Sequence, residues 1–518
     1  MQASEELGVN ANSRELGERV VKGAGLVMFS AISMQLLGVV RTVVLARLLS
    51  LDSFGLAAMT LTVSGALYTL TNTGVIASVI SERFDDEREL HSYANLLWTI
   101  EAARGVTIAA FILLGAWPFA HFYHEPRLFP ILLVMALQPL STALTNIGLP
   151  LQERRLHLKR VTLHGALTNT VTVVATLAIA IATHNYWAII WGQVLGAFTS
   201  TAFSYWFSSY RPRLEWHLPL ARRAFDFGKH QFVIGISNYV LTTMDNVLVG
   251  FTLGTISLGI YSVAYSFCTM ARQVASAAFG NVLFPAFAAA GREDDPARLR
   301  SLVERAFTLG MAGLSLFLVP LIVYSPAIMR IFFPRFGVTA VEPMRWLLVA
   351  GWFSGLLSLF SSFFVGLGRP AIESKFKVLD AVVFVAVLVP LTHLHGVVGA
   401  AQAGAITWAL ASIWRLRAGN SLAPGAFARL PSLTISSVLV GAGATVVGLW
   451  PFARTSIFSL GGFERAFHPV PPSLGTAWLQ LLVGAPLLAL LCAGGLMALH
   501  PVARTQMPAL ARKLLGRR

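Results

Sequence analysis

Residues 231–254 read QFVIGISNYVLTTMDNVLVGFTLG, a mostly apolar run that contains one acidic residue, Asp245. Such a run can cross the hydrocarbon core of a bilayer, which takes about 20 mostly apolar residues. Similar runs recur throughout the chain: 55% of its 518 residues are hydrophobic and only 12% are charged, and the mean hydropathy is +0.67. Ordinary soluble domains carry about a quarter charged residues. We therefore predict an all-α polytopic membrane protein.

The apolar runs predict about fourteen membrane-spanning helices. Closely spaced runs require tight turns at residues 183–188, 252–257 and 392–399. The predicted spans are residues 24–47, 54–79, 94–119, 128–150, 161–183, 187–209, 230–253, 256–283, 303–324, 344–367, 376–394, 397–415, 431–451 and 476–499.

Most of the 39 Lys and Arg residues fall in alternate loops, among them residues 154–160, 211–229 and 504–518. Arg415 and Arg417, at and just after the end of the twelfth span, are counted with the basic residues of the cytoplasmic side. Because cytoplasmic loops are rich in basic residues, we expect both termini in the cytoplasm. Residues 1–21 lack the features of a cleaved signal peptide. The net charge of +15 does not indicate nucleic-acid binding, because the basic clusters lie between apolar runs.

A weak internal repeat relates the two halves of the chain. LSLDSFGL at 49–56 and LGTISLGI at 253–260 share Leu, Ser and Gly at an offset of 204 residues. The repeat predicts two six-helix bundles, at 1–213 and 214–420, with two extra spans and a basic tail at 421–518. An even number of spans per repeat places the pseudo-twofold axis along the membrane normal.

Polar and ionisable residues within the spans predict a substrate-binding central cavity between the two bundles. Such residues are costly in hydrocarbon and normally face a bundle interior or an aqueous cavity. Arg41 and Asp245 occupy equivalent repeat positions with opposite charge, so they could face one another. The predicted lining residues are Arg41, Tyr68, Asn72, Glu101, Arg104, Asn238, Thr242, Asp245, Tyr265, Thr269 and Arg272.

Two structural alternatives remain open for these charges. Arg41 and Asp245 could form a buried ion pair that only fixes helix packing, and Glu101 could pair with Arg104 one turn along the same helix. No catalytic group, metal or cofactor is predicted: Cys268 and Cys492 lie in apolar segments, and the paired histidines at 121/124 and 393/395 lack further ligands.

RTVVLARLLSLDSFGLAAM at 41–59 and MDNVLVGFTLGTISLGIYSVAYSF at 244–267 resemble the Wzx-type polysaccharide flippases. This family belongs to the multidrug/oligosaccharidyl-lipid/polysaccharide exporter superfamily, and the resemblance covers nearly the whole chain. It implies alternating access in the bacterial inner membrane. The substrate would be an undecaprenyl-diphosphate-linked oligosaccharide, moved to the periplasmic leaflet for exopolysaccharide, capsule or O-antigen assembly. Among the site residues, the resemblance supports Asp245 and Arg272, and the repeat adds Arg41.

The resemblance also implies partners: membrane lipids, the polysaccharide polymerase and export machinery, and a coupling ion, H⁺ or Na⁺. Arg41 and Arg272 would hold the diphosphate, since guanidinium groups bind phosphate oxygens in bidentate fashion. Three alternatives stay open: a flippase for lipid II or another lipid-linked precursor, a cation-coupled multidrug exporter, and a membrane polymerase or ligase. The last would need a large polar outward loop, whereas the longest one, 452–475, is apolar and proline-rich.

Overall fold

The computed structural model describes residues 33–71, 86–155, 158–292 and 295–427, together with positions 30, 79, 84 and 482. Every regular element in this part of the chain is helical. The chain divides into two compact units, residues 1–239 and 240–518. Apart from position 482, the predicted spans at 431–451 and 476–499 lie outside the described residues.

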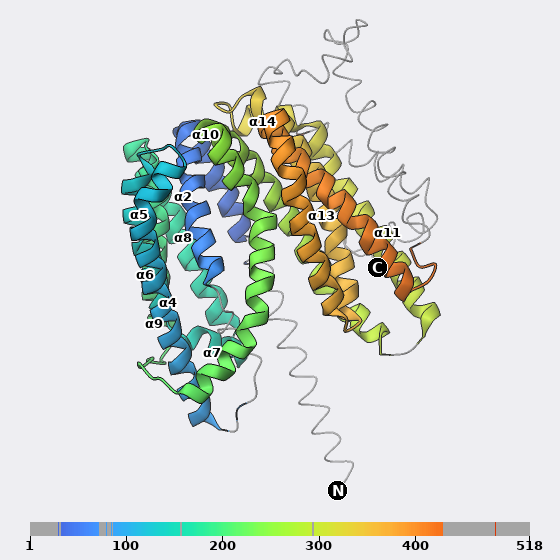
Figure 1. The fold of residues 1–518 in the computed structure, drawn as a ribbon, viewed down its shortest axis with the longest axis horizontal. Helices are drawn as coiled ribbons and strands as arrows, with labels where there is room; N and C mark the ends of the chain where they lie inside the picture. Colours follow the sequence, from blue (N-terminus) through green and yellow to red (C-terminus); the bar gives the residue numbers. More distant parts are fainter. Residues whose placement is uncertain are drawn as a thin grey trace, which may run out of the picture. The chain divides into compact units, whose positions relative to one another are not determined.

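Unit 1 is built from a helix at residues 33–48 and from shorter and longer helices that follow it (Figure 1). Side chains fix two of the helix starts: Ser50 caps α2 by accepting from Ser53 N at 3.2 Å, and Asp86 caps α4 by accepting from Glu89 N at 2.6 Å. Such caps satisfy backbone donors that have no partner inside the helix. The helices are α2 (Leu51–Leu70), α4 (Glu87–Phe122), α5 (Leu128–Met135), α6 (Leu137–Ala143), α7 (Gly148–Arg154), α8 (Leu158–Thr183) and α9 (Trp187–Phe207).

The span predicted at 128–150 is not one straight helix in the structure. Pro139 has no N–H to donate to the carbonyl of Met135, and α5 ends at Met135. A larger bend, of 49°, lies further on, between the helical stretch Leu128–Ala143 and helix α7. The predicted fourth span is therefore a broken segment, long and apolar enough to cross a membrane if its bent parts count as one.

The predicted tight turns occur at all three places. Between α8 and α9, His184 adopts a φ of 49°. Helix α10 (Leu218–Ala290) breaks at Gly254, with φ 78° and ψ −176°, and α14 (Pro370–Leu422) breaks at Gly396, with φ 58° and ψ −134°. Both glycine conformations are strained for residues with a Cβ. Each break joins two predicted spans.

Unit 2 contains the later part of α10 and the helices that follow it. Helices α11 and α13 approach closely because Gly310 meets Leu359 and Gly355 meets Leu314, as small residues permit between membrane helices. Phe360 and Phe427 stack, and Phe307 contacts both edge to face, with centroid distances of 4.8 to 5.6 Å among the three rings. The remaining elements are α11 (Pro296–Val323), α12 (Ser325–Phe332), η1 (Val338–Ala340), α13 (Val341–Gly366) and α14.

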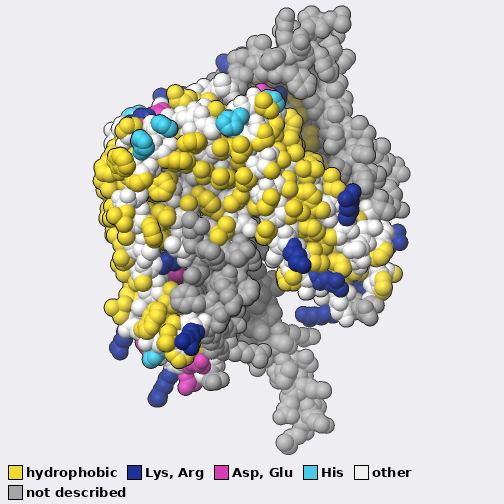
Figure 2. Space-filling model, in the orientation of Figure 1, with side chains coloured by type: hydrophobic (Ala, Val, Ile, Leu, Met, Phe, Trp, Pro, Cys, Tyr) yellow, Lys and Arg dark blue, Asp and Glu magenta, His cyan; other side chains and the backbone are white. Residues whose placement is uncertain are grey.

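Six helices in the described part are long and apolar enough to cross a membrane, or seven if the bent segment 128–154 counts as one. Figure 2 shows hydrophobic side chains over most of the visible face of this part. Leu114 and Trp117 on α4, for example, are 78% and 66% exposed. Apolar surface of this extent fits lipid rather than water. The chain is a multi-pass membrane protein, while the count of fourteen spans and the repeat symmetry stay predictions.

Candidate functional site

Unit 1 brings three predicted site residues together on α2 and α4. Arg104 donates to the same carboxylate oxygen of Glu101 from Nη2 at 2.5 Å and from Nε at 2.9 Å. Their side chains are only 18% and 12% exposed. The intrahelical pairing that the spacing left open is confirmed.

Tyr68 faces this ion pair from α2. Its hydroxyl is buried, and Thr142 on α6, Arg104 and Glu101 are the polar side chains that act on it. A Tyr hydroxyl can both donate and accept, so one such neighbour does not use its full hydrogen-bonding capacity. Tyr68, Glu101 and Arg104 are therefore a polar cluster that can accept a further group.

For three other predicted site residues, the structure gives few or no side-chain contacts. Arg41 lies half-buried on the helix at 33–48, and its pairing with Asp245 stays a prediction, since the two residues belong to different units. Asn72 lies outside the described residues, and Arg272 lies on α10 with its side chain outside them.

Asp245 is buried in unit 2, with 3% exposure. Tyr261 donates to its Oδ2 at 2.6 Å, and the backbone N of Asn246 donates to its Oδ1 at 2.8 Å. A carboxylate held by donors on both oxygens can stay charged away from water. The sequence pattern did not indicate Tyr261, although it lies one turn before the predicted site residue Tyr265 and stacks on that ring with a centroid distance of 5.9 Å.

A cavity of about 40 Å³ lies beside Asp245, and three predicted site residues line it: Asp245, Tyr265 and Thr269. A water molecule needs about 10–15 Å³ of such space, so the cavity holds a few waters or one small ion. Thr242 and Asn238 are exposed, and the carbonyl of Thr242 accepts from the hydroxyl of Tyr265 at 2.9 Å. The other lining residues are Leu241, Tyr261, Cys268, Leu347, Ala350, Gly351, Ser354, Phe384, Gly404 and Trp408.

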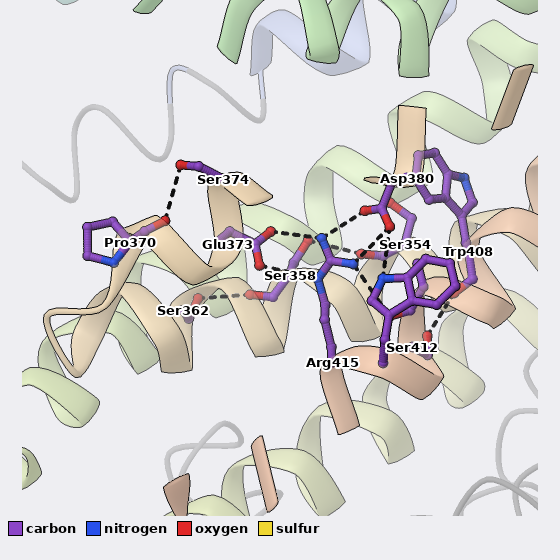
Figure 3. Close-up of polar contacts among 12 residues, drawn as sticks. Ser354, Ser358, Ser362, Pro370, Glu373, Ser374, Asp380, Trp408, Ser412 and Arg415 are labelled. Carbon is purple, nitrogen blue, oxygen red and sulfur yellow. Dashed lines mark hydrogen bonds and ion pairs between the residues drawn. The ribbon is translucent and has the colours of Figure 1, made fainter. Parts of the chain in front are cut away.

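A second charged cluster in unit 2, on α14, was missed by sequence reasoning (Figure 3). Arg415 lies between Glu373 and Asp380, and the three side chains are 1%, 8% and 2% exposed. Its Nε and Nη2 donate to the two oxygens of Glu373 at 3.2 Å each, and its Nη1 and Nη2 donate to Asp380 at 3.2 and 2.8 Å. This buried charge cluster joins the two limbs of α14 on either side of Gly396.

Charge counting placed Arg415 among the basic residues of the cytoplasmic side and gave it no partner. In the structure it lies inside α14, which runs to Leu422, and it is a buried partner of two carboxylates. The ring of Phe376 lies 5.2 Å from its guanidinium carbon, and the indole N–H of Trp414 donates to Asp380 at 3.1 Å. The seven-residue spacing of Glu373 and Asp380, which places both on one helix face, was the available signal.

The segment between α9 and α10 is hydrogen-bonded to α4. Asn95 donates from its amide nitrogen to Glu215 at 2.8 Å, and its amide oxygen accepts from the hydroxyl of Tyr210 at 2.6 Å. The backbone N of Glu215 donates to Thr99 at 3.0 Å. The hydrogen bond from Asn95 lowers the pKa of Glu215, and burial raises the pKa of Tyr210 to about 12. This segment is therefore fixed to unit 1 rather than a free tether.

The sequence matches a family of polysaccharide biosynthesis proteins. The model of the polysaccharide biosynthesis protein family matches residues 44–334. The lipopolysaccharide biosynthesis protein WzxC of Escherichia coli K12 is 24% identical over 392 residues, which cover 74% of this chain and 77% of that protein. The succinoglycan biosynthesis transport protein ExoT of Rhizobium meliloti is 26% identical over 251 residues, 47% of this chain and 49% of that protein.

The fold is also similar to a solved membrane transporter. The lipid II flippase MurJ, in an inward closed conformation, superposes with a TM-score of 0.69 over 90% of this chain and 98% of that one, at 12% identity. At so low an identity the likeness shows a shared fold and nothing of the substrate.

Proposed function

Because this chain belongs to the polysaccharide biosynthesis protein family, we propose that it flips polyprenyl-diphosphate-linked oligosaccharide repeat units across the bacterial inner membrane. The direction is from the cytoplasmic to the periplasmic leaflet, and the product is exopolysaccharide, capsule or O-antigen. The observation that carries the proposal is the family match over residues 44–334, which includes parts of both units. The relatives named for lipopolysaccharide and succinoglycan biosynthesis support this class of product.

During flipping, the lipid bilayer accommodates the apolar part of the substrate and the protein accommodates the polar part. The polyprenyl tail stays in hydrocarbon, whereas the diphosphate and the sugars need a polar route, since charges are costly at the bilayer centre. Two six-helix bundles that open alternately to the two sides provide such a route without leaving an open pore. The fold shared with a known flippase is compatible with this alternating access.

The cluster of Tyr68, Glu101 and Arg104 is the described part of the proposed route in unit 1. Arg104 uses Nε and Nη2 for Glu101, which leaves Nη1 for a phosphate oxygen. The hydroxyl of Tyr68 lies beside Thr142, and because it can both donate and accept, a sugar hydroxyl can bind to it as well. Arg41 and Arg272 would add positive charge for the diphosphate, while Asn72, Asn238 and Thr242 would contact sugar.

Asp245 is proposed to act on a small ion rather than on sugar. Its cavity of about 40 Å³ is far below the roughly 300–1,000 Å³ of small-molecule pockets, so an oligosaccharide does not fit there. A buried carboxylate next to a few waters is suited to exchange H⁺ or Na⁺. The role is therefore ion coupling, with Tyr265 and Thr269 as neighbouring oxygen groups.

Complementation of flippase-null cells tests the proposal. Wild-type protein should restore surface polysaccharide. Arg104→Gln and Asp245→Asn should lower the yield roughly tenfold or more, because each removes a charged contact worth about 1.5 kcal/mol or more. The matched control is Thr170→Val, since this exposed hydroxyl bonds only to its own helix at Ala166 O, 2.9 Å away. Full activity of both charge variants at normal expression would exclude these roles.

Two other cell assays separate the remaining alternatives. A lipid II flippase would restore growth to cells that lack lipid II transport, and a multidrug exporter would raise resistance to organic cations. A cavity for organic cations should be acidic or apolar, whereas Arg41, Arg104 and Arg272 lie on the predicted spans of this chain. We therefore expect neither phenotype.

A further inference from the structure

A separate pocket in unit 1 lies where α8 begins and α9 ends. Its volume is about 440 Å³, and its lining residues are distant in sequence from the proposed transport residues on α2 and α4. Two arginines and three aromatic rings line it. The lining residues are Arg160, Tyr205, Trp206, Phe207, Ser208, Ser209 and Arg211.

The two arginines of this pocket have unused hydrogen-bond donors. Arg211 is fixed in place, because its Nη1 donates to the carbonyls of Ser208 at 2.6 Å and Tyr210 at 2.9 Å. Its guanidinium carbon also lies 5.8 Å from the ring centroid of Tyr205. Arg160 is exposed and forms no ion pair with any described residue. The pocket therefore presents two cations with no acidic side chain among its lining residues.

The pocket lies at the end of an apolar surface formed by two helices. Helices α8 and α9 are joined side by side, as the ring of His164 bonds to Ser200 O at 2.9 Å. Their outward apolar side chains follow i, i+4 and i+7 or i+8 spacings, which place them on one face of each helix. Those on α8 are Leu163, Leu167, Val171 and Val174, 37–60% exposed, and those on α9 are Trp191, Leu195 and Phe198, 38–49% exposed.

The exposed side chain of Trp206 indicates the level of the bilayer at which this pocket lies. It is 79% exposed and stacks on Phe207 with a centroid distance of 6.3 Å. Exposed Trp residues are typical of the headgroup level of a bilayer, and the basic loops at 154–160 and 211–213 belong to the predicted cytoplasmic side. The partial positive charge of the N-terminus of α8 adds to the attraction for an anion.

We infer that this pocket binds the phosphate of an anionic phospholipid headgroup from the cytoplasmic leaflet. Arg160 and Arg211 donate to the phosphate oxygens, Trp206 contacts the glycerol region, and the acyl chains lie along the apolar face of α8 and α9. A free phosphate ion would leave this apolar face unused. Basic pockets between membrane helices on the cytoplasmic side are suited to anionic lipid headgroups. The site does not depend on what the protein transports.

Native mass spectrometry of the delipidated full-length protein in detergent tests the site. The added probes are phosphatidylglycerol, phosphatidylethanolamine, a polyprenyl diphosphate and inorganic phosphate, each in separate titrations. Wild-type protein should bind one phosphatidylglycerol more tightly than phosphatidylethanolamine and should not retain inorganic phosphate. Arg160→Gln should weaken phosphatidylglycerol binding roughly tenfold, as loss of one charge-assisted hydrogen bond predicts.

Arg160→Gln is informative because this side chain has no described contact to lose, so folding should be unaffected. The control is Arg213→Gln, which should bind as the wild type does; Arg213 is exposed, lies in the segment after α9 that also carries Arg211, and does not line the pocket. Equal phosphatidylglycerol binding by the wild type and Arg160→Gln would overturn the proposal. Retention of the polyprenyl diphosphate in place of phosphatidylglycerol would also overturn it, since the site would then serve the transported lipid.

Discussion

Removing Arg415 should destabilise unit 2 more than removing any exposed arginine. The guanidinium is 1% exposed and lies between two carboxylates that are 8% and 2% exposed. Arg415→Met keeps much of the volume of the side chain but leaves Glu373 and Asp380 buried without their cation. Taking one partner from a buried ion pair costs about 3–5 kcal/mol, because a charge is left without compensation.

The structure places this variant at the upper end of that range. Arg415 makes four hydrogen bonds of 2.8 to 3.2 Å to the two carboxylates, so its loss affects two acidic groups rather than one. We expect the free energy of unfolding to fall by about 4–5 kcal/mol. Trp414 would keep its bond to Asp380, 3.1 Å long, which recovers only a small part of this loss.

Chemical denaturation in detergent micelles, followed by intrinsic tryptophan fluorescence, measures this change. The control is Arg417→Met, since Arg417 is exposed two residues further on. A triple variant, Glu373→Gln with Asp380→Asn and Arg415→Met, removes all three charges and should regain most of the stability, as neutral replacements of buried ion clusters often do.

Two results would refute this reasoning about the buried charge cluster. In the first, Arg415→Met unfolds at the same denaturant concentration as Arg417→Met. In the second, the triple variant is as unstable as Arg415→Met, which would mean that the loss comes from packing rather than from uncompensated charge.

Three further predictions concern other parts of the chain. Gly396→Ala should lower the thermal midpoint of unfolding, because the φ of 58° and ψ of −134° are unfavourable for a residue with a Cβ; an unchanged midpoint would contradict the tight turn at this glycine. The pKa of Glu215 is lowered by the bond from Asn95, so its stabilisation is full above its unfolded pKa and disappears as the pH falls through the folded value. Glu215→Gln should flatten this acid-side loss of stability in thermal scans, and an identical pH profile would argue against it. Tyr261→Phe removes the 2.6 Å bond to Asp245 and should lower stability by about 1–3 kcal/mol, measured by denaturant titration, whereas no change would show that water replaces the hydroxyl.

Helical class and the local turns follow from sequence because they depend on local chemistry. Apolar runs predict helices, and the glycines at 254 and 396 stand where two runs meet without a polar loop. Pro139 was present in the sequence, but whether a proline bends or ends a membrane helix depends on its neighbours. The broken fourth span therefore needed the structure.

The candidate site was predictable where polar residues share one helix face. Glu101 and Arg104 are one turn apart, and Tyr265 and Thr269 line the same cavity as Asp245. The partnership of Arg415 with Glu373 and Asp380 depends on the fold of α14 about Gly396, a contact over 35 to 42 residues that periodicity alone does not report. Charge counting used Arg415 only to orient the chain, because it considers each residue without its partners.

Transport in reconstituted vesicles tests the central claim most directly. The purified protein is placed in liposomes that contain the lipid-linked repeat unit extracted from the source bacterium, and a glycosidase or lectin outside the vesicles reports sugars that reach the outer leaflet. We predict that protein-containing vesicles expose the inner-leaflet sugars over time, while protein-free vesicles do not. Equal exposure in both, with the protein folded and inserted, would contradict the assignment as a flippase.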